Sequence, residues 1–131
     1  MIVDTSVLVA LVRREPEEDA FLGALASSPR PVIASANFFE ACIVIDSAKR
    51  DDLSETLDSI VATLDLDIAP VTRLHVAIAR DAYRKFGKGN HHARLNFGDC
   101  IAYAMAKAND DVLLFKGDDF SQTDIKPALK R

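Results

Sequence analysis

The sequence has few of the features that would place a protein in a membrane or outside the cell. Its longest uninterrupted apolar run, Cys100–Ala106, is far shorter than the roughly 20 residues that a membrane-spanning helix needs. The first residues contain no basic segment followed by a long apolar stretch, so we expect no secretory signal. The two cysteines, Cys42 and Cys100, lie in apolar helical patterns and lack C-x-x-C spacing. These features predict a cytoplasmic protein whose cysteines are free and buried.

An excess of positive charge is also missing, because the formal net charge is −4. A protein that holds nucleic acid by bulk electrostatics is normally basic, so the total charge argues against that mode of binding. The charge is unevenly distributed, however: the charged residues of 51–58 are all acidic, whereas residues 84–94 include no acid. The basic residues and histidines of the second stretch are Arg84, Lys85, Lys88, His91, His92 and Arg94. Cations bound at a metal site would offset part of the negative total.

Repeats, low-complexity tracts and internal linkers are absent too, and 131 residues suit one domain spanning residues 1–131. Strands are expected at 1–4, 31–35, 68–71 and 112–115, with a short final strand after Thr123. Helices are expected at 7–12, from Pro16 to before Ser27, and at 37–50, 53–64, 76–86 and 101–108. Strands that alternate with helices predict a three-layer α/β fold with a central, mostly parallel sheet.

Acidic residues follow the expected strands at several points along the chain. Asp4 ends the first strand, Glu40 lies one turn into the helix after the second, and Asp99 opens the most apolar helix. Asp118 and Asp119 come just after the fourth strand. Because the functional crevice of a parallel sheet lies beyond the carboxyl ends of its strands, we expect these acids at one edge. Carboxylates gathered in this way repel one another unless a cation neutralises them.

Mg²⁺ would suit such a site, because it is bound by one or two carboxylates and several waters. It would activate water and stabilise the charge that develops during hydrolysis of a phosphodiester bond. Each acid also has a purely structural explanation. Asp4 could cap a helix, Asp99 could interact with a helix dipole, and Asn37 could form a capping box with Glu40. The coincidence of four segments at one edge favours the metal site over four independent caps.

Several short motifs in these same segments are similar to those of a known family. They are Ile2–Ser6, Ser35–Glu40, Asn96–Cys100, Leu113–Phe120 and Thr123–Ile125. In this order and spacing, the sequence resembles the PIN-domain nucleases, and within them the VapC-type toxins of bacterial toxin–antitoxin operons. The resemblance covers essentially the whole chain.

The resemblance implies an α/β/α sandwich, Mg²⁺- or Mn²⁺-dependent endoribonuclease activity, a homodimer, and inhibition by a small cognate antitoxin. Residue by residue, Asp4, Glu40 and Asp99 match the acidic triad of the family. Asp119 matches the fourth acid better than the adjacent Asp118 does. The resemblance assigns metal ligation to Asp4 and Asp99, with Glu40 orienting or deprotonating water.

Two further features are open to more than one interpretation. The basic stretch 84–94 could hold RNA phosphates, or it could be a solvated surface loop. Its adjacent histidines have no second matched pair, so they are poor evidence for a zinc site. The apolar helices at 7–12 and 53–64 could form a groove for an amphipathic antitoxin helix, or both could be buried.

Three other functions compete with a toxin ribonuclease. A PIN nuclease of RNA maturation, without an antitoxin, would use the same chemistry. A receiver-type signalling domain also binds Mg²⁺ at strand ends, but it would have paired acids after the first strand, where Asp4 stands alone. A catalytically inactive interaction module would not need the complete acidic set.

Overall fold

A four-stranded parallel sheet forms the centre of the molecule. The computed structural model describes residues 1–130, so the expected domain end at Arg131 lies outside the described residues. The strands are β1 (Ile2–Val3), β2 (Val32–Ala34), β3 (Asp67–Ala69) and β4 (Leu113–Leu114), in the order β3-β2-β1-β4. All three neighbouring pairs are parallel, with Ile2 opposite both Val32 and Leu113. The predicted parallel sheet is confirmed.

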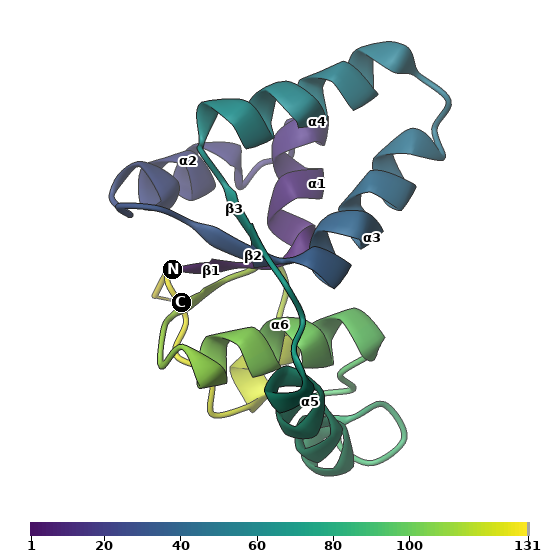
Figure 1. Cartoon of the computed structure of the whole chain (residues 1–131), viewed down its shortest axis with the longest axis vertical. Helices are drawn as coiled ribbons and strands as arrows, with labels where there is room; N and C mark the ends of the chain where they lie inside the picture. The colour runs from purple at the N-terminus through teal and green to yellow at the C-terminus, as the bar shows by residue number, and fades with distance from the viewer. Residues whose placement is uncertain (131) are drawn as a thin grey trace.

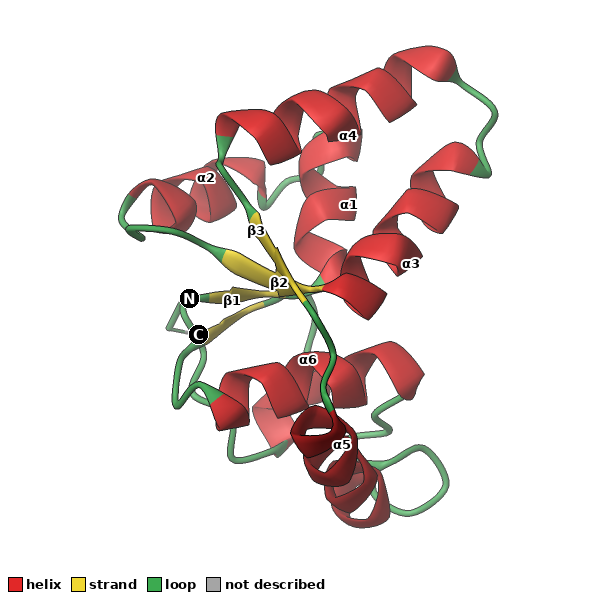
Figure 2. Cartoon of the chain, in the orientation of Figure 1, coloured by secondary structure: helices red, strands yellow, loops and turns green. Residues whose placement is uncertain are grey.

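Helices cover both faces of this sheet, as Figures 1 and 2 show. The six α-helices are α1 (Thr5–Arg13), α2 (Glu18–Ala26), α3 (Ser35–Asp46), α4 (Asp51–Thr63), α5 (Arg73–Phe86) and α6 (Phe97–Ala108). A short 3-10 helix, η1 (Asp119–Gln122), follows β4. Helices α1 to α4 lie on one side of the sheet, and α5 and α6 lie on the other. The three-layer α/β/α architecture is therefore confirmed. Within residues 1–130, no helix is long and apolar enough to cross a membrane.

The alternation of side chains along each short strand divides the core into two halves. Ile2, Ala34 and Leu113 belong to the cluster under α5 and α6. Their chain neighbours Val3, Ile33 and Leu114 belong to the cluster under α1 to α4. Successive side chains of a strand point to opposite faces, so strands of two or three residues supply both halves of the core. All six side chains are completely buried, so both faces of the sheet are covered.

The structure corrects several sequence-based boundaries. The expected final strand is reduced to one parallel bridge between Leu113 and Pro127, formed by the main-chain oxygen of Lys126 and the N–H of Ala128 on Leu113. Helix α3 begins at Ser35, two residues before the expected start, so Asn37 lies inside it and forms no capping box with Glu40. The helix expected from Pro16 begins at Glu18, after a turn.

Two glycines in this fold provide a matched test of packing. A Cβ at Gly87, the residue that ends α5, would lie 2.3 Å from the main-chain oxygen of Tyr83, whereas a Cβ at Gly23 within α2 would meet nothing within 4 Å. We expect Gly87→Ala to lower the free energy of unfolding by about 1–3 kcal/mol, because the backbone must shift. Gly23→Ala should raise it by about 0.5–1 kcal/mol, because alanine is the better helix former. Urea denaturation measures both, and equal stabilities would contradict the described end of α5.

Candidate active site

The carboxyl edge of the sheet carries the acids that the sequence singled out. Asp4 follows β1 and caps α1, Glu40 lies in α3 directly after β2, and Asp99 lies in the first turn of α6. Asp119 opens η1, which follows β4. The N-termini of α1 and α3 point to this edge, since both helices begin within two residues of a strand end. The positive ends of their dipoles favour negative charge there.

Asp4 is held by its own helix. It is 5% exposed, and its Oδ2 accepts hydrogen bonds from the main-chain N–H of Ser6 at 3.1 Å and from Ser6 Oγ at 2.6 Å. Ser6 Oγ in turn accepts from the main-chain N–H of Lys116 at 3.0 Å, which ties Asp4 to the end of β4. Burial raises the pKa of Asp4, the Ser6 hydrogen bonds oppose this effect, and the charge of Glu40 adds to it.

Asp99 carries a carboxyl group whose pKa lies well above its ordinary value. Its Oδ2 accepts from the main-chain N–H of Asn96 at 3.0 Å, while Asn96 Oδ1 accepts from the N–H of Asp99 at 2.9 Å. The pKa of Asp99 is raised to about 7, mainly by burial; the hydrogen bond from Asn96 opposes this shift, and the charges of Asp4, Asp119 and Glu40 contribute to it. The capping explanation therefore holds for Asp99, yet a cap alone does not explain three other carboxylates within electrostatic range.

Two adjacent acids, Asp118 and Asp119, follow β4. Asp119 is among the charges that raise the pKa of Asp99. Asp118 lies one residue earlier, at the start of η1, and its main-chain oxygen accepts from the N–H of Ser121 at 3.0 Å. Four acids are thus brought together at this edge, each from a different segment of the chain.

Glu40 approaches this group by lying against a glycine. A Cβ at Gly98 would lie 2.6 Å from Glu40 Oε1 and 3.0 Å from Oε2. The carboxylate therefore occupies the space of the missing side chain, one residue before Asp99. The sequence gives little indication of this role for Gly98. The only signal for it is a glycine in the first turn of an otherwise apolar helix.

The donor set suits a hard divalent cation. Within residues 1–130, no three His, Cys, Asp or Glu side chains lie close enough together to hold a metal ion by themselves. Mg²⁺ commonly takes only one or two carboxylates and completes its shell with water, so this spacing fits it better than a closed structural site. A cation would also relieve the mutual repulsion that raises the pKa of Asp99.

The basic stretch is attached to the same region. His92 Nε2 lies 2.9 Å from Gln122 Oε1, so the loop between α5 and α6 contacts η1, the helix that carries Asp119. His91 stacks on His92 with ring centroids 4.0 Å apart, and its ring meets Phe86 edge-on at 5.2 Å. Both histidines thus have structural contacts, while Lys88 and Arg94 are exposed. Gln122 had no signal in the sequence.

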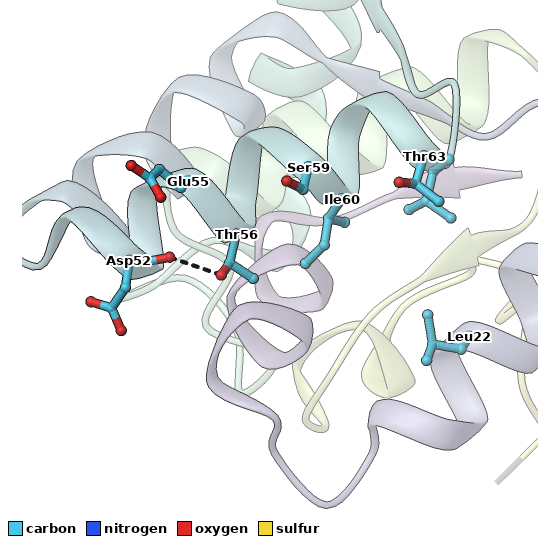
Figure 3. Close-up of a pocket in the computed structure, with 8 residues that line it drawn as sticks. Leu22, Asp52, Glu55, Thr56, Ser59, Ile60 and Thr63 are labelled. Atoms are coloured by element: carbon cyan, nitrogen blue, oxygen red, sulfur yellow. Dashed lines mark hydrogen bonds between the residues drawn. The ribbon is translucent and has the colours of Figure 1, made fainter.

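A groove lies away from the carboxylates, between α2 and α4. In Figure 3, Ile60 on α4 points toward Leu22 on α2, with Asp52 and Glu55 farther along α4. Leu11 and Val12 of α1 line the adjoining part, together with Leu53. The expectation of a groove between α1 and α4 is corrected in part, because α1 is buried in the core and contributes only the floor.

Comparison with known proteins is consistent with this geometry. The PIN domain family matches residues 1–126. Ribonuclease VapC28 of Mycobacterium tuberculosis is 40% identical over 132 residues, which cover 100% of this chain and 99% of the relative. Ribonuclease VapC of Mycolicibacterium smegmatis is 39% identical over 125 residues, which cover 95% and 97%.

Solved structures share the fold at lower identity. Mycobacterium tuberculosis VapC20, described as a sarcin–ricin loop cleaving toxin, matches with a TM-score of 0.72 and 16% identity over 95% of each chain. A toxin–antitoxin complex from Klebsiella pneumoniae matches with a TM-score of 0.71 and 18% identity over 94% of this chain and 92% of the other. The chain therefore belongs to the PIN-domain family and, within it, to the VapC ribonucleases.

Proposed function

We propose that this protein is the toxin of a toxin–antitoxin pair and a Mg²⁺-dependent endoribonuclease that hydrolyses RNA phosphodiester bonds. Mn²⁺ is expected to substitute for Mg²⁺. The observation that carries the proposal is the convergence of Asp4, Glu40, Asp99 and Asp119 at the carboxyl edge of the sheet, where the Glu40 carboxylate lies against Gly98. The relatives of about 40% identity are named ribonucleases, which supports the same reaction.

Each acid has a distinct role in this proposal. Asp4 and Asp99 hold the metal, since both are fixed by hydrogen bonds to neutral groups of their own helices. The bound metal would lower the pKa of water and stabilise negative charge on the reacting phosphate. Glu40 accepts the proton of the attacking water at its carboxylate. Asp119 adds negative charge that favours cation binding at Asp99.

Substitution of single acids tests these roles. Asp4→Asn and Asp99→Asn should each reduce Mg²⁺-dependent RNA cleavage at least about 100-fold while the fold is retained, because a metal ligand is removed. Asp118→Asn is the matched control and should cleave like the wild type, whereas Asp119→Asn should be impaired. Cleavage is followed on bulk cellular RNA by sequencing of the newly formed ends. Full cleavage by either ligand variant would contradict the assignment.

The raised pKa of Asp99 adds a stability test of the metal-free protein. The pKa is 3.8 ordinarily and about 7 in the folded chain, so the folded state binds an extra proton between these values. Stability is therefore lost as the pH rises from about 4 to about 7. Asp99→Asn should unfold several degrees above the wild type at pH 8, and the difference should shrink at pH 4.5. Thermal unfolding in EDTA measures this, and a difference independent of pH would contradict it.

The basic loop is proposed to contact RNA phosphates beside the acids, because His92 anchors it to η1. Replacement of Lys88 and Arg94 by Ala should weaken binding of a labelled single-stranded RNA in EDTA. It should also reduce the slope of log K against log[salt] by about 0.7 for each phosphate that is no longer neutralised. Lys49 and Arg50, exposed in another turn, provide a matched control, since Lys49 and Arg94 share a positive φ of 54° and 58°. Equal slopes for the two double variants would contradict the proposed RNA contact and favour the alternative that the loop is simply solvated.

The antitoxin is proposed to occupy the groove between α2 and α4. The groove combines apolar Leu22 and Ile60 with acidic Glu18, Asp52 and Glu55, so it suits a basic amphipathic helix with spaced apolar anchors. The Klebsiella pneumoniae toxin–antitoxin complex of the same fold supports such a partner.

Copurification with the product of the neighbouring small gene tests this groove. Leu22→Lys removes an apolar contact and adds a like charge, so it should weaken the complex at least about 10-fold without affecting RNA cleavage. Ala26→Lys, also exposed on α2 but outside the groove, should bind normally. A complex that forms equally with both variants would place the partner elsewhere. If the neighbouring gene product binds neither form nor the wild type, the RNA-maturation alternative is favoured.

A second copy of the chain is proposed to cover the apolar face of α5 and α6. Val76, Tyr83 and Phe97 are 55%, 48% and 77% exposed on this face, and they line a pocket together with Ile101. Such exposed apolar groups mark an interface in a water-soluble domain. Val76→Glu should convert a dimer to a monomer in light-scattering measurements, whereas Asp81→Lys on the other flank of α5 should not. A wild-type monomer at micromolar concentration would contradict this proposal.

A further inference from the structure

Asn37 is a buried polar residue that has no role in the proposed reaction. It is 1% exposed, and its side-chain Nδ2 donates to the main-chain oxygen of Gly98 at 2.9 Å. Its main-chain oxygen accepts from Thr5 Oγ1 at 2.8 Å. Asn37 thus joins α3 to the first residues of both α1 and α6.

The residues that Asn37 contacts are chain neighbours of the proposed site. Thr5 follows Asp4, Gly98 precedes Asp99, and Glu40 lies on the same helix one turn after Asn37. One residue therefore connects the segments that carry three of the four acids. Helices α3 and α6 approach each other closely at this connection. Glu40 Oε1 on α3 lies where a Cβ of Gly98 on α6 would be.

The amide is not needed to satisfy hydrogen bonds in the core. Asn37 Oδ1 is buried without a hydrogen-bond partner, and an unpaired buried oxygen destabilises a fold. The Gly98 oxygen lies in the first turn of α6, where helical N–H groups already serve as donors. An apolar side chain of similar volume at position 37 would therefore satisfy the core at least as well.

We propose that Asn37 is a positioning residue, whose amide holds the start of α6 against α3 and so sets the spacing of Asp4, Glu40 and Asp99. Like charges at this contact push the two helices apart, and the hydrogen bond to Gly98 opposes that force. Gly98 contributes to the same close contact between α3 and α6, since it leaves room for the Glu40 carboxylate. The inference rests on the proposed metal-dependent function.

The test compares Mn²⁺ affinity with stability. Asn37→Leu removes the amide and keeps the number and branching of the side-chain heavy atoms, so it should weaken Mn²⁺ binding at least about 10-fold, as removal of a group that orients ligands does. Its thermal midpoint should stay within a few degrees of the wild type. Ile45→Val, a buried change on the same helix far from the acids, should leave Mn²⁺ affinity unaltered despite losing stability. Calorimetric titration of the metal-free proteins provides the affinities.

The outcomes separate this inference from the proposed function. If wild-type protein binds no Mn²⁺ and cleaves no RNA, the proposed function fails and the role of Asn37 with it. If the wild type binds Mn²⁺ and Asn37→Leu binds it equally, only the positioning role is overturned. Should Asn37→Leu not fold, Asn37→Ala decides, because it removes the same amide bond to Gly98 without adding atoms. Wild-type Mn²⁺ affinity in that variant would equally overturn the inference.

Discussion

Repulsion among carboxylates at one edge of the sheet is the constraint that the surrounding structure accommodates. The parallel order β3-β2-β1-β4 places the carboxyl ends of all strands on the same side, so acids that follow different strands are brought together. Burial then makes ionisation of Asp99 costly, as its pKa of about 7 shows. A structure with this arrangement has its lowest free energy when the carboxylates share a cation or a proton.

The groups that hold the acids in place are neutral. Ser6 binds Asp4, Asn96 binds Asp99, and Gly98 makes room for Glu40. Lys116 shows the contrast, because its main-chain N–H supports Ser6 while its Nζ lies 3.2 Å from both Glu15 and Glu17. Neutral neighbours orient the carboxylates without neutralising them, as the proposed metal site would require.

The remaining surface features are arranged around this edge according to charge. The cationic loop is attached to η1 beside Asp119, which is where we propose that it contacts RNA phosphates. The acidic and apolar groove lies between α2 and α4, and the apolar face lies on α5 and α6. A negatively charged substrate and a basic partner would thus use different parts of a chain whose net charge is −4.

The architecture could be predicted from the amino-acid sequence, because the signals for helices and strands are local. Alternation of strands and helices predicted the parallel sheet, and Gly87 marked the end of α5. The position of Asp4, Glu40 and Asp99 relative to strand ends predicted that they would meet, while their roles stay predictions. The burial of α1, the effect of Asp119 on Asp99 and the position of Glu40 against Gly98 became evident from the fold alone. These features depend on which side chains face each other across elements distant in the chain, and no pattern within one element encodes that.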